Sequence, residues 1–182
     1  RQDPSYFRID ARTGCEDIWQ PSTSLLYGFS DIGGVYNPLL LADIERYWSE
    51  LGSRSTPLYD LLNVKYIIGH KDVPLDWDKF VLAYDGDPQV NVYRNTKVQP
   101  RAFLVQRVER VESQEAALVA IHGKDFDPRS IAIVERGSPL YGELDTTSRV
   151  EISRYELNRI ELETSSRAES LLFLSEIFYP GW

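Results

Sequence analysis

The sequence predicts an α+β fold in which a mixed helix and strand portion comes first and an antiparallel β portion comes last. Before Gly142, apolar residues recur at helical spacing in three segments, and runs of β-branched and aromatic residues lie between them. From residue 143 to residue 182 no helix signal is present, and apolar residues alternate with polar ones. We therefore expect an α+β portion at residues 1–142 that contains a β-α-β unit. Residues 143–182 are expected to form an antiparallel meander, arranged as a β-sandwich or half-sandwich.

Helix start and stop signals place the three helices. In "NPLLLADIERYWSELG", Asn37 can cap the helix, a proline follows at the first helical position, and Gly52 suits the end. One apolar stripe runs along this helix, made of Leu40, Ile44, Tyr47, Trp48 and Leu51. Thr56 followed by Pro57 begins a shorter helix, and Ser113 caps a third one over "QEAALVAIHG".

Runs rich in β-branched and aromatic residues predict the strands. They cover residues 6–10, 64–69, 80–95 (a hairpin with its turn at 85–88), 101–111 and 130–135. The last two flank the third helix, which indicates parallel strands with a right-handed crossover. In the meander, alternating segments meet at a turn at residues 156–158. Residues 13–34 show no clean period and are interpreted as an ordered loop.

The composition is that of a soluble globular protein with an acidic surface. The chain has 182 residues, of which 42% are hydrophobic and 26% charged, with a net charge of −8 and a pI near 4.8. Nucleic acid is not an expected partner, because binding phosphates requires a basic face. The single cysteine, Cys15, excludes an internal disulfide framework and a thiolate metal cluster. No apolar run approaches the ~18 residues of a membrane span.

Candidate metal and catalytic residues are few. Three Asp-x-Asp spacings could hold a divalent cation on a nucleotide sugar: Asp76/Asp78, Asp85/Asp87 and Asp125/Asp127. Sequences such as "YDGDP" and "DFDP" are more typical of turns, and no His or Cys joins them. His70 and His122 stand at the ends of predicted elements, where histidines commonly cap or face solvent. We therefore predict no catalytic residue, no metal and no cofactor.

The segment "LLYGFSDIGGVYNPLLL" carries the candidate ligand-binding residues Tyr27, Asp31, Tyr36 and Asn37. Aromatic faces beside short polar side chains suit a sugar, which stacks through its C–H groups and hydrogen-bonds through its hydroxyls. The alternative is an irregular loop whose aromatic side chains plug into the core. The sequence leaves both interpretations open.

Several segments in order resemble the soluble domain of the YfhO-type family of bacterial multi-spanning membrane proteins. They are "LYGFSDIGGVYNPLLLADIERYW", "LYDLLNVKYIIG", "VNVYRNTKVQPRAFLV", "YELNRIELE" and "LLFLSEIFYPGW". The family resembles C-type membrane glycosyltransferases, which use lipid-linked sugar donors. The resemblance implies a location on the extracytoplasmic side of the bacterial cell membrane. Catalytic carboxylates of such enzymes are expected in loops between membrane helices, so none is carried over to this chain.

The leading function hypothesis is therefore a noncatalytic extracytoplasmic domain of a polytopic membrane protein that transfers lipid-linked sugars to a cell-surface polymer. Its expected partners are the membrane-embedded remainder of its own chain and a glycan or lipid-linked sugar. The alternative is a freestanding carbohydrate-binding or protein-interaction module. A soluble enzyme is the third class, and it is disfavoured because the sequence shows no convergent set of acid, base and nucleophile residues.

The final residues, "SEIFYPGW", place a turn signal at Pro180–Gly181 directly after an apolar strand. We expect this chain to be a fragment of a longer protein in which a returning strand follows. An uncovered edge on the strand at residues 171–179 predicts self-association through the C-terminal strands. The competing expectation is that residues 6–10 cover that edge.

Overall fold

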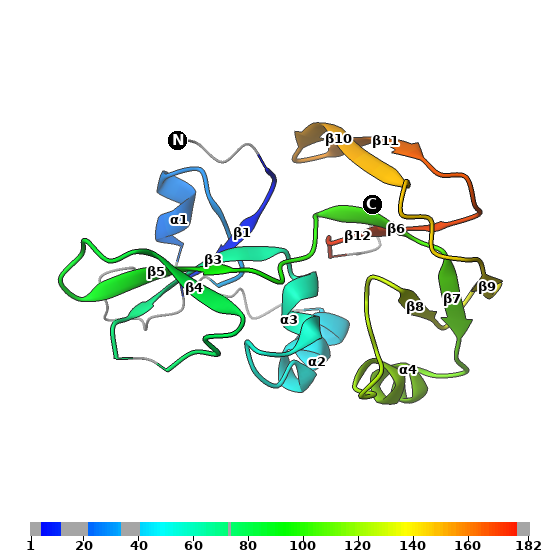
Figure 1. Ribbon diagram of the computed structural model, residues 1–182, viewed down its shortest axis with the longest axis horizontal. Helices are drawn as coiled ribbons and strands as arrows, with labels where there is room; N and C mark the ends of the chain where they lie inside the picture. The colour runs from blue at the N-terminus through cyan, green and yellow to red at the C-terminus, as the bar shows by residue number, and fades with distance from the viewer. Residues whose placement is uncertain (1–4, 12–21, 34–40, 73, 178–182) are drawn as a thin grey trace. The chain divides into compact units, whose positions relative to one another are not determined.

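The computed structural model describes residues 5–11, 22–33, 41–72 and 74–177. It divides the chain into two compact units, Arg1–Pro100 with Glu176–Trp182, and Arg101–Ser175 (Figure 1). The boundary expected at Gly142 from the change in periodicity falls inside the second unit. Helices and strands occur together with parallel and antiparallel pairings, which confirms the α+β class.

The first unit is built on a five-stranded mixed sheet with the order β2-β1-β3-β5-β4. Its elements are β1 (Arg8–Asp10), α1 (Thr23–Leu26), β2 (Ser30–Asp31), α2 (Ala42–Glu50), α3 (Pro57–Leu61), β3 (Val64–His70), β4 (Phe80–Tyr84) and β5 (Val90–Asn95). β1 pairs in parallel with both β2 and β3, and β5 is antiparallel to β3 and β4. The predicted hairpin at residues 80–95 is thus confirmed. The expectation of a loop at residues 13–34 is wrong for its described part, because α1 and β2 form there.

The helices of the first unit begin and end where local chemistry favours it. Thr56 caps α3, since its Oγ1 accepts a hydrogen bond from the backbone N–H of Tyr59 at 3.3 Å. After α2, Gly52 has a φ of +74°, a conformation that favours glycine. The predicted cap Asn37 lies outside the described residues. The Tyr47 hydroxyl donates to the carbonyl of Leu58 at 2.6 Å and so joins α2 to α3.

Buried apolar side chains from α3 and the strands form the core of this unit. They are Ile9, Leu58, Tyr59, Val64, Ile67, Phe80, Val90 and Tyr93. The Tyr59 ring meets the Phe80 ring edge-on, with centroids 6.3 Å apart. Burial of these large rings fixes α3 against the sheet, and with it the loop that precedes α3.

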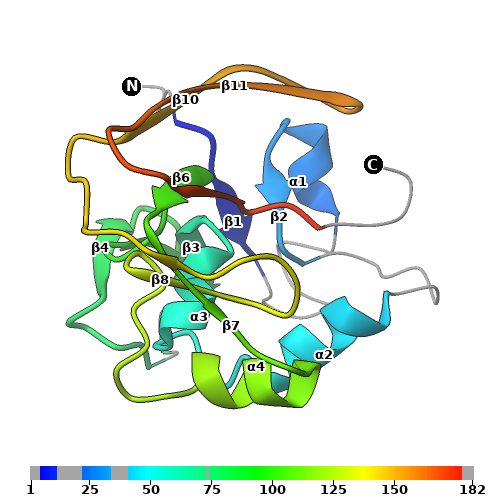
Figure 2. The same ribbon diagram turned by 90° about the vertical axis from the view of Figure 1, so that its right-hand side faces the viewer.

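The second unit contains three small sheets that do not close on one another (Figure 2). Its elements are β6 (Ala102–Val105), β7 (Arg107–Arg110), α4 (Gln114–Ile121), β8 (Ile131–Val134), β9 (Leu140–Tyr141), β10 (Arg149–Glu156), β11 (Arg159–Ser165) and β12 (Leu171–Leu174). β7 and β8 are parallel with α4 between them, so the predicted β-α-β unit is confirmed. Ser113 caps α4 by accepting from the backbone N–H of Ala116 at 3.2 Å, as expected.

The predicted strand at residues 101–111 is two strands that belong to different sheets. β6 pairs with β12, whereas β7 pairs with β8 and β9. The break falls at Gln106, a buried residue whose carbonyl accepts from the backbone N–H of Gly142 at 3.0 Å. All four residues of β6 are apolar, whereas in β7 the buried Val108 follows the exposed Arg107, so the alternation is present only in the second strand.

The C-terminal part of the second unit is antiparallel, as predicted. β10 and β11 form a hairpin in which Glu156 pairs with Arg159. β12 pairs with β6, from Leu171 with Val105 to Leu174 with Ala102. Residues 178–179, the end of the strand expected at residues 171–179, lie outside the described residues. β1 pairs with β2 and β3, so within the described residues it is not the partner of β12. Among those residues, no helix combines the length and apolarity needed to cross a membrane.

Candidate ligand site

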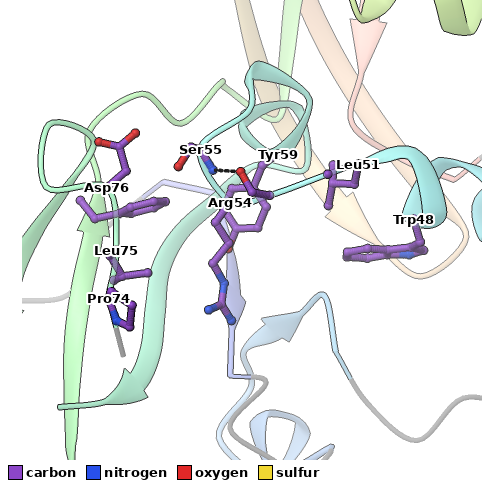
Figure 3. Close-up of a pocket in the computed structure, with 11 residues that line it drawn as sticks. Trp48, Leu51, Arg54, Ser55, Tyr59, Pro74, Leu75 and Asp76 are labelled. Carbon is purple, nitrogen blue, oxygen red and sulfur yellow. Dashed lines mark hydrogen bonds between the residues drawn. The ribbon is translucent and has the colours of Figure 1, made fainter. Parts of the chain in front are cut away.

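A cavity of about 530 Å³ opens in the first unit (Figure 3). One side is formed by the end of α2 and the loop that follows it, from Trp48 to Ser55. The opposite side is the segment 74–76, and Tyr59 and Phe80 complete the lining. The volume lies within the range of ~300–1,000 Å³ that small-molecule sites occupy.

The cavity is lined by polar and apolar groups together, among them a half-buried indole. Leu51, Tyr59 and Phe80 are 5%, 0% and 1% exposed, so they form the floor behind the lining and expose little of their own surface. Trp48 is half-buried on α2. Figure 3 shows Trp48 and Leu51 on one side of Arg54, and Pro74, Leu75 and Asp76 on the other. A flat ligand with one apolar face can therefore contact an aromatic surface here.

Arg54 is held in place by a carboxylate that is completely buried. Its Nε donates to Oδ2 of Asp10 at 2.9 Å, and the Tyr59 hydroxyl donates to the same oxygen at 2.7 Å. Asp10 ends β1 and is 0% exposed, whereas the Arg54 side chain is 25% exposed. Because Asp10 fixes the guanidinium, Arg54 is a preorganised hydrogen-bond donor at the cavity.

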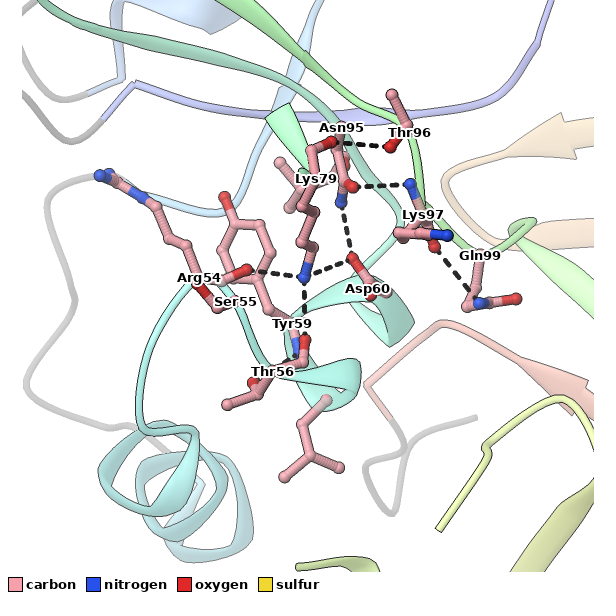
Figure 4. Close-up of polar contacts among 12 residues, drawn as sticks. Arg54, Ser55, Thr56, Tyr59, Asp60, Lys79, Asn95, Thr96, Lys97 and Gln99 are labelled. Carbon is pink, nitrogen blue, oxygen red and sulfur yellow. Dashed lines mark hydrogen bonds and ion pairs between the residues drawn. The ribbon is translucent and has the colours of Figure 1, made fainter. Parts of the chain in front are cut away.

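A single buried lysine connects the two sides of the cavity (Figure 4). Nζ of Lys79 donates to the carbonyls of Arg54 and Thr56 at 2.7 and 3.0 Å, and lies 2.9 Å from Oδ1 of Asp60. The backbone N–H of Lys79 donates to the carbonyl of Asp76 at 3.0 Å. Lys79 thus positions the loop around Arg54 and also the segment that contains Asp76.

The Lys79–Asp60 pair is stabilised by further hydrogen bonds. Oδ1 of Asp60 also accepts from Nδ2 of Asn95 at 2.7 Å. Burial raises the pKa of the Asp60 carboxyl, against the hydrogen bonds from Asn95 and Lys79. Burial likewise lowers the pKa of the Lys79 ammonium, against its pairing with Asp60. Both pKa shifts go in the direction that desolvation favours, so the pairing offsets only part of the desolvation cost at this site.

The two predicted ligand residues that the structure describes, Tyr27 and Asp31, are not part of this cavity. Asp31 ends β2 beside β1, and its Oδ1 accepts from the backbone N–H of Gly33 at 2.8 Å. Tyr27 follows α1 and is 67% exposed. Neither residue lines the cavity. Tyr36 and Asn37 lie outside the described residues.

Asp31 makes the stability of the protein depend on pH in a defined direction. Burial raises the pKa of its carboxyl, and the nearby Asp10 charge adds to this effect. A raised folded-state pKa contributes stability that is full below the unfolded-state pKa of ~3.9 and is lost as pH rises through the folded-state value. We expect the free energy of unfolding of wild type, relative to Asp31→Asn, to decrease from pH 3.5 to pH 7. Urea denaturation of both proteins at each pH measures this difference.

Asp145 provides the control with the opposite sign. Hydrogen bonds from Arg167 and Thr147 lower the pKa of its exposed carboxyl to about 2. Its contribution is therefore present above the unfolded-state pKa and is lost as pH falls toward 2. Relative to Asp145→Asn, wild type should gain stability from pH 3.5 to pH 7. If the free energy of unfolding of wild type relative to Asp31→Asn stayed constant or increased from pH 3.5 to pH 7, the raised pKa assigned to Asp31 would be contradicted.

The Asp-x-Asp spacings form turns, as expected. The carboxylate of Asp76 accepts from the backbone N–H of Asp78, that of Asp87 from Gln89, and that of Asp127 from Arg129. His122 caps the end of α4, and His70 is the last residue of β3. Among the described residues, no three His, Cys, Asp or Glu side chains are grouped so that they could hold a metal ion.

Sequence reasoning missed the residues that line the cavity. Trp48 belongs to the apolar stripe predicted for the first helix, and its spacing does not distinguish a core residue from one beside a cavity. The signal that could have indicated the site is the loop "GSRS" between two helices, which places Arg54 among small residues. Comparison with protein-family models, curated proteins and solved structures finds no match for this chain.

Proposed function

We propose that the first unit binds carbohydrate without catalysing its transfer, as part of an extracytoplasmic domain of a membrane protein that handles lipid-linked sugars. The observation that carries the binding proposal is the cavity that the half-buried indole of Trp48 and the preorganised side chain of Arg54 both line. The membrane context is supported by the sequence resemblance to YfhO-type proteins.

The chemistry of the lining suits a sugar ring. A pyranose presents an apolar C–H face, which stacks on an aromatic ring, and hydroxyls at its edge, which need donors and acceptors. The half-buried indole of Trp48 supplies the apolar contact, and the buried floor residues support the lining from behind. Arg54 supplies N–H donors, and Ser53, Ser55 and Asp76 supply oxygen acceptors. Donors and acceptors thus stand beside aromatic surface in one small cavity.

A binding role is favoured over a catalytic one by the state of the carboxylates. Glycosidic chemistry commonly uses two carboxyl groups that reach the substrate. Asp10 is fully buried, and its Oδ2 accepts from both Tyr59 and Arg54. Asp60 is paired with Lys79. Asp76 is the one carboxylate among the described residues that line the cavity, so these residues do not supply it with a partner acid or base.

The second unit is proposed to provide the half-sandwich that the alternating pattern predicts. Figure 2 shows the β10–β11 hairpin alongside β6 and β12. Arg101, which precedes β6, donates to the hydroxyl of Tyr155 in β10, and its guanidinium lies 5.2 Å from the centre of that ring. This contact ties the hairpin to the neighbouring pair of strands and supports two facing layers.

An amide NMR titration with a panel of uncharged and charged oligosaccharides tests the binding function. We expect saturable chemical-shift changes in the second half of α2, the loop to Tyr59 and residues 75, 76, 79 and 80, because these residues line or hold the cavity. Chemical-shift changes centred on Tyr27 and Asp31 would instead indicate that the sugar binds at the segment predicted from the sequence. The absence of saturable shifts with every oligosaccharide would overturn the proposal. Apolar segments of ~20 residues elsewhere in the parent reading frame would support the membrane context over a freestanding module.

A further inference from the structure

We propose, resting on the proposed carbohydrate-binding function, that the cavity selects uncharged saccharides and discriminates against acidic ones such as uronates. An arginine in a sugar site suggests recognition of a carboxylate or phosphate. Here the arrangement of charges around Arg54 leads to the opposite selectivity, because the positive charge of this arginine is already neutralised inside the protein.

Asp10 is the group that neutralises Arg54. Nε of Arg54 lies 2.9 Å from Oδ2 of Asp10, and the carboxylate is 0% exposed. Water does not screen a charge pair at such a position as it screens a surface pair. Within the described part of the chain, Asp10 is the polar partner of the Arg54 side chain. Arg54 therefore retains N–H donors for hydroxyl groups, while its charge offers little net attraction to an anion.

The other charges near the cavity add to this preference. The cation Lys79 is paired with Asp60 at 2.9 Å, and both side chains are more than nine-tenths buried. Asp76 lines the cavity as a further carboxylate. Among the described residues at and behind the cavity, two cations (Arg54 and Lys79) thus stand against three carboxylates (Asp10, Asp60 and Asp76), and the whole chain has a net charge of −8. An acidic ligand would lose hydration and would meet no unpaired cation among these residues, which makes its binding unfavourable.

Asp10→Asn is the substitution that should change the selectivity. Asparagine keeps a side-chain oxygen that can accept from Arg54 and Tyr59, but it removes the compensating charge. The positive charge of the Arg54 guanidinium would then have no compensating carboxylate beside it, so an acidic ligand could pair with it. Asp78→Asn is the matched control, because Asp78 is exposed, is two residues from Asp76 and does not line the cavity.

The experiment uses calorimetric titration with two probes: the best-binding uncharged oligosaccharide of the NMR panel and the same oligosaccharide with its terminal C6 oxidised to a carboxylate. For wild type and Asp78→Asn we expect the uncharged probe to bind at least tenfold more tightly. For Asp10→Asn we expect the ratio of the two affinities to shift at least tenfold toward the acidic probe. Tighter binding of the acidic probe to wild type, or an unchanged ratio in Asp10→Asn, would overturn the inference.

A measurement on wild type alone decides the matter if Asp10→Asn does not fold. Affinity for the acidic probe should not fall between 20 and 200 mM salt, since no uncompensated cation at the cavity attracts it. A tenfold loss of affinity over that range would contradict the inference. Failure of the proposed function is a different result, because neither probe would then bind wild type.

Discussion

Replacing Asp60 by alanine is expected to lower the free energy of unfolding by about 3–5 kcal/mol, the usual cost of breaking a buried ion pair from one side. The Lys79 and Asp60 side chains are 5% and 8% exposed, and their charged atoms lie 2.9 Å apart. Without Asp60, the ammonium of Lys79 would remain buried without its compensating charge, and Asn95 would lose an acceptor. Chemical denaturation at pH 7 measures the change.

An exposed ion pair in the second unit is the matched control. Arg107 and Glu109 lie 2.6 Å apart, but their side chains are 54% and 40% exposed. Glu109→Ala should change the free energy of unfolding by less than about 1 kcal/mol, because solvent screens exposed pairs. Equal effects of Asp60→Ala and Glu109→Ala would show that burial of the first pair does not determine its contribution. Asp60→Asn, which keeps an oxygen acceptor, should be less destabilising than Asp60→Ala.

Loss of Asp60 should also affect the cavity, because Lys79 holds the loop around Arg54 that lines it. Nζ of Lys79 is bonded to the carbonyls of Arg54 and Thr56. A lysine released from Asp60 would gain hydration by moving toward solvent, and the loop would lose both hydrogen bonds. Any variant of Asp60 that still folds should therefore bind saccharide less tightly than wild type, although Asp60 itself does not line the cavity.

Local signals in the sequence predicted local structure well. Thr56 and Ser113 cap α3 and α4 as expected, because capping depends on a side chain and a backbone N–H three residues away. The hairpins at residues 80–95 and 149–165 also formed as predicted, because the turn and the alternation lie in one continuous segment. The β-α-β unit followed from the spacing of its three elements.

Features that depend on contacts between distant segments could not be predicted in the same way. The break at Gln106 arises because two consecutive strands join different sheets, and their partners come from β8, β9 and β12. The cavity depends on Arg54 meeting Asp10, which is 44 residues away, and on Lys79 reaching back to the loop before α3. No periodicity in a single segment encodes these contacts.

Of the substitutions considered, replacement of Trp48 is expected to have the largest effect on ligand binding. Its half-buried indole lines the cavity from α2, and stacking on a sugar would use its apolar face. Trp48→Ala is expected to weaken saccharide binding at least tenfold, which corresponds to about 1.4 kcal/mol. The fold should persist, because the residue is not part of the fully buried core.

Trp77 is the matched control for this substitution. It belongs to the same unit, is 59% exposed and contacts the ring of Tyr93, with centroids 5.5 Å apart. It does not line the cavity. Trp77→Ala also replaces an indole by a methyl group, and it is expected to change saccharide affinity less than twofold.

The most direct test of the cavity as a carbohydrate site is therefore calorimetric titration of wild type, Trp48→Ala and Trp77→Ala with the oligosaccharide that binds wild type best. Circular dichroism should first show that all three proteins are folded. Loss of at least tenfold in affinity for Trp48→Ala, with Trp77→Ala like wild type, is the result expected from the structure. Equal affinity of Trp48→Ala and wild type, or a larger loss in Trp77→Ala, would contradict it.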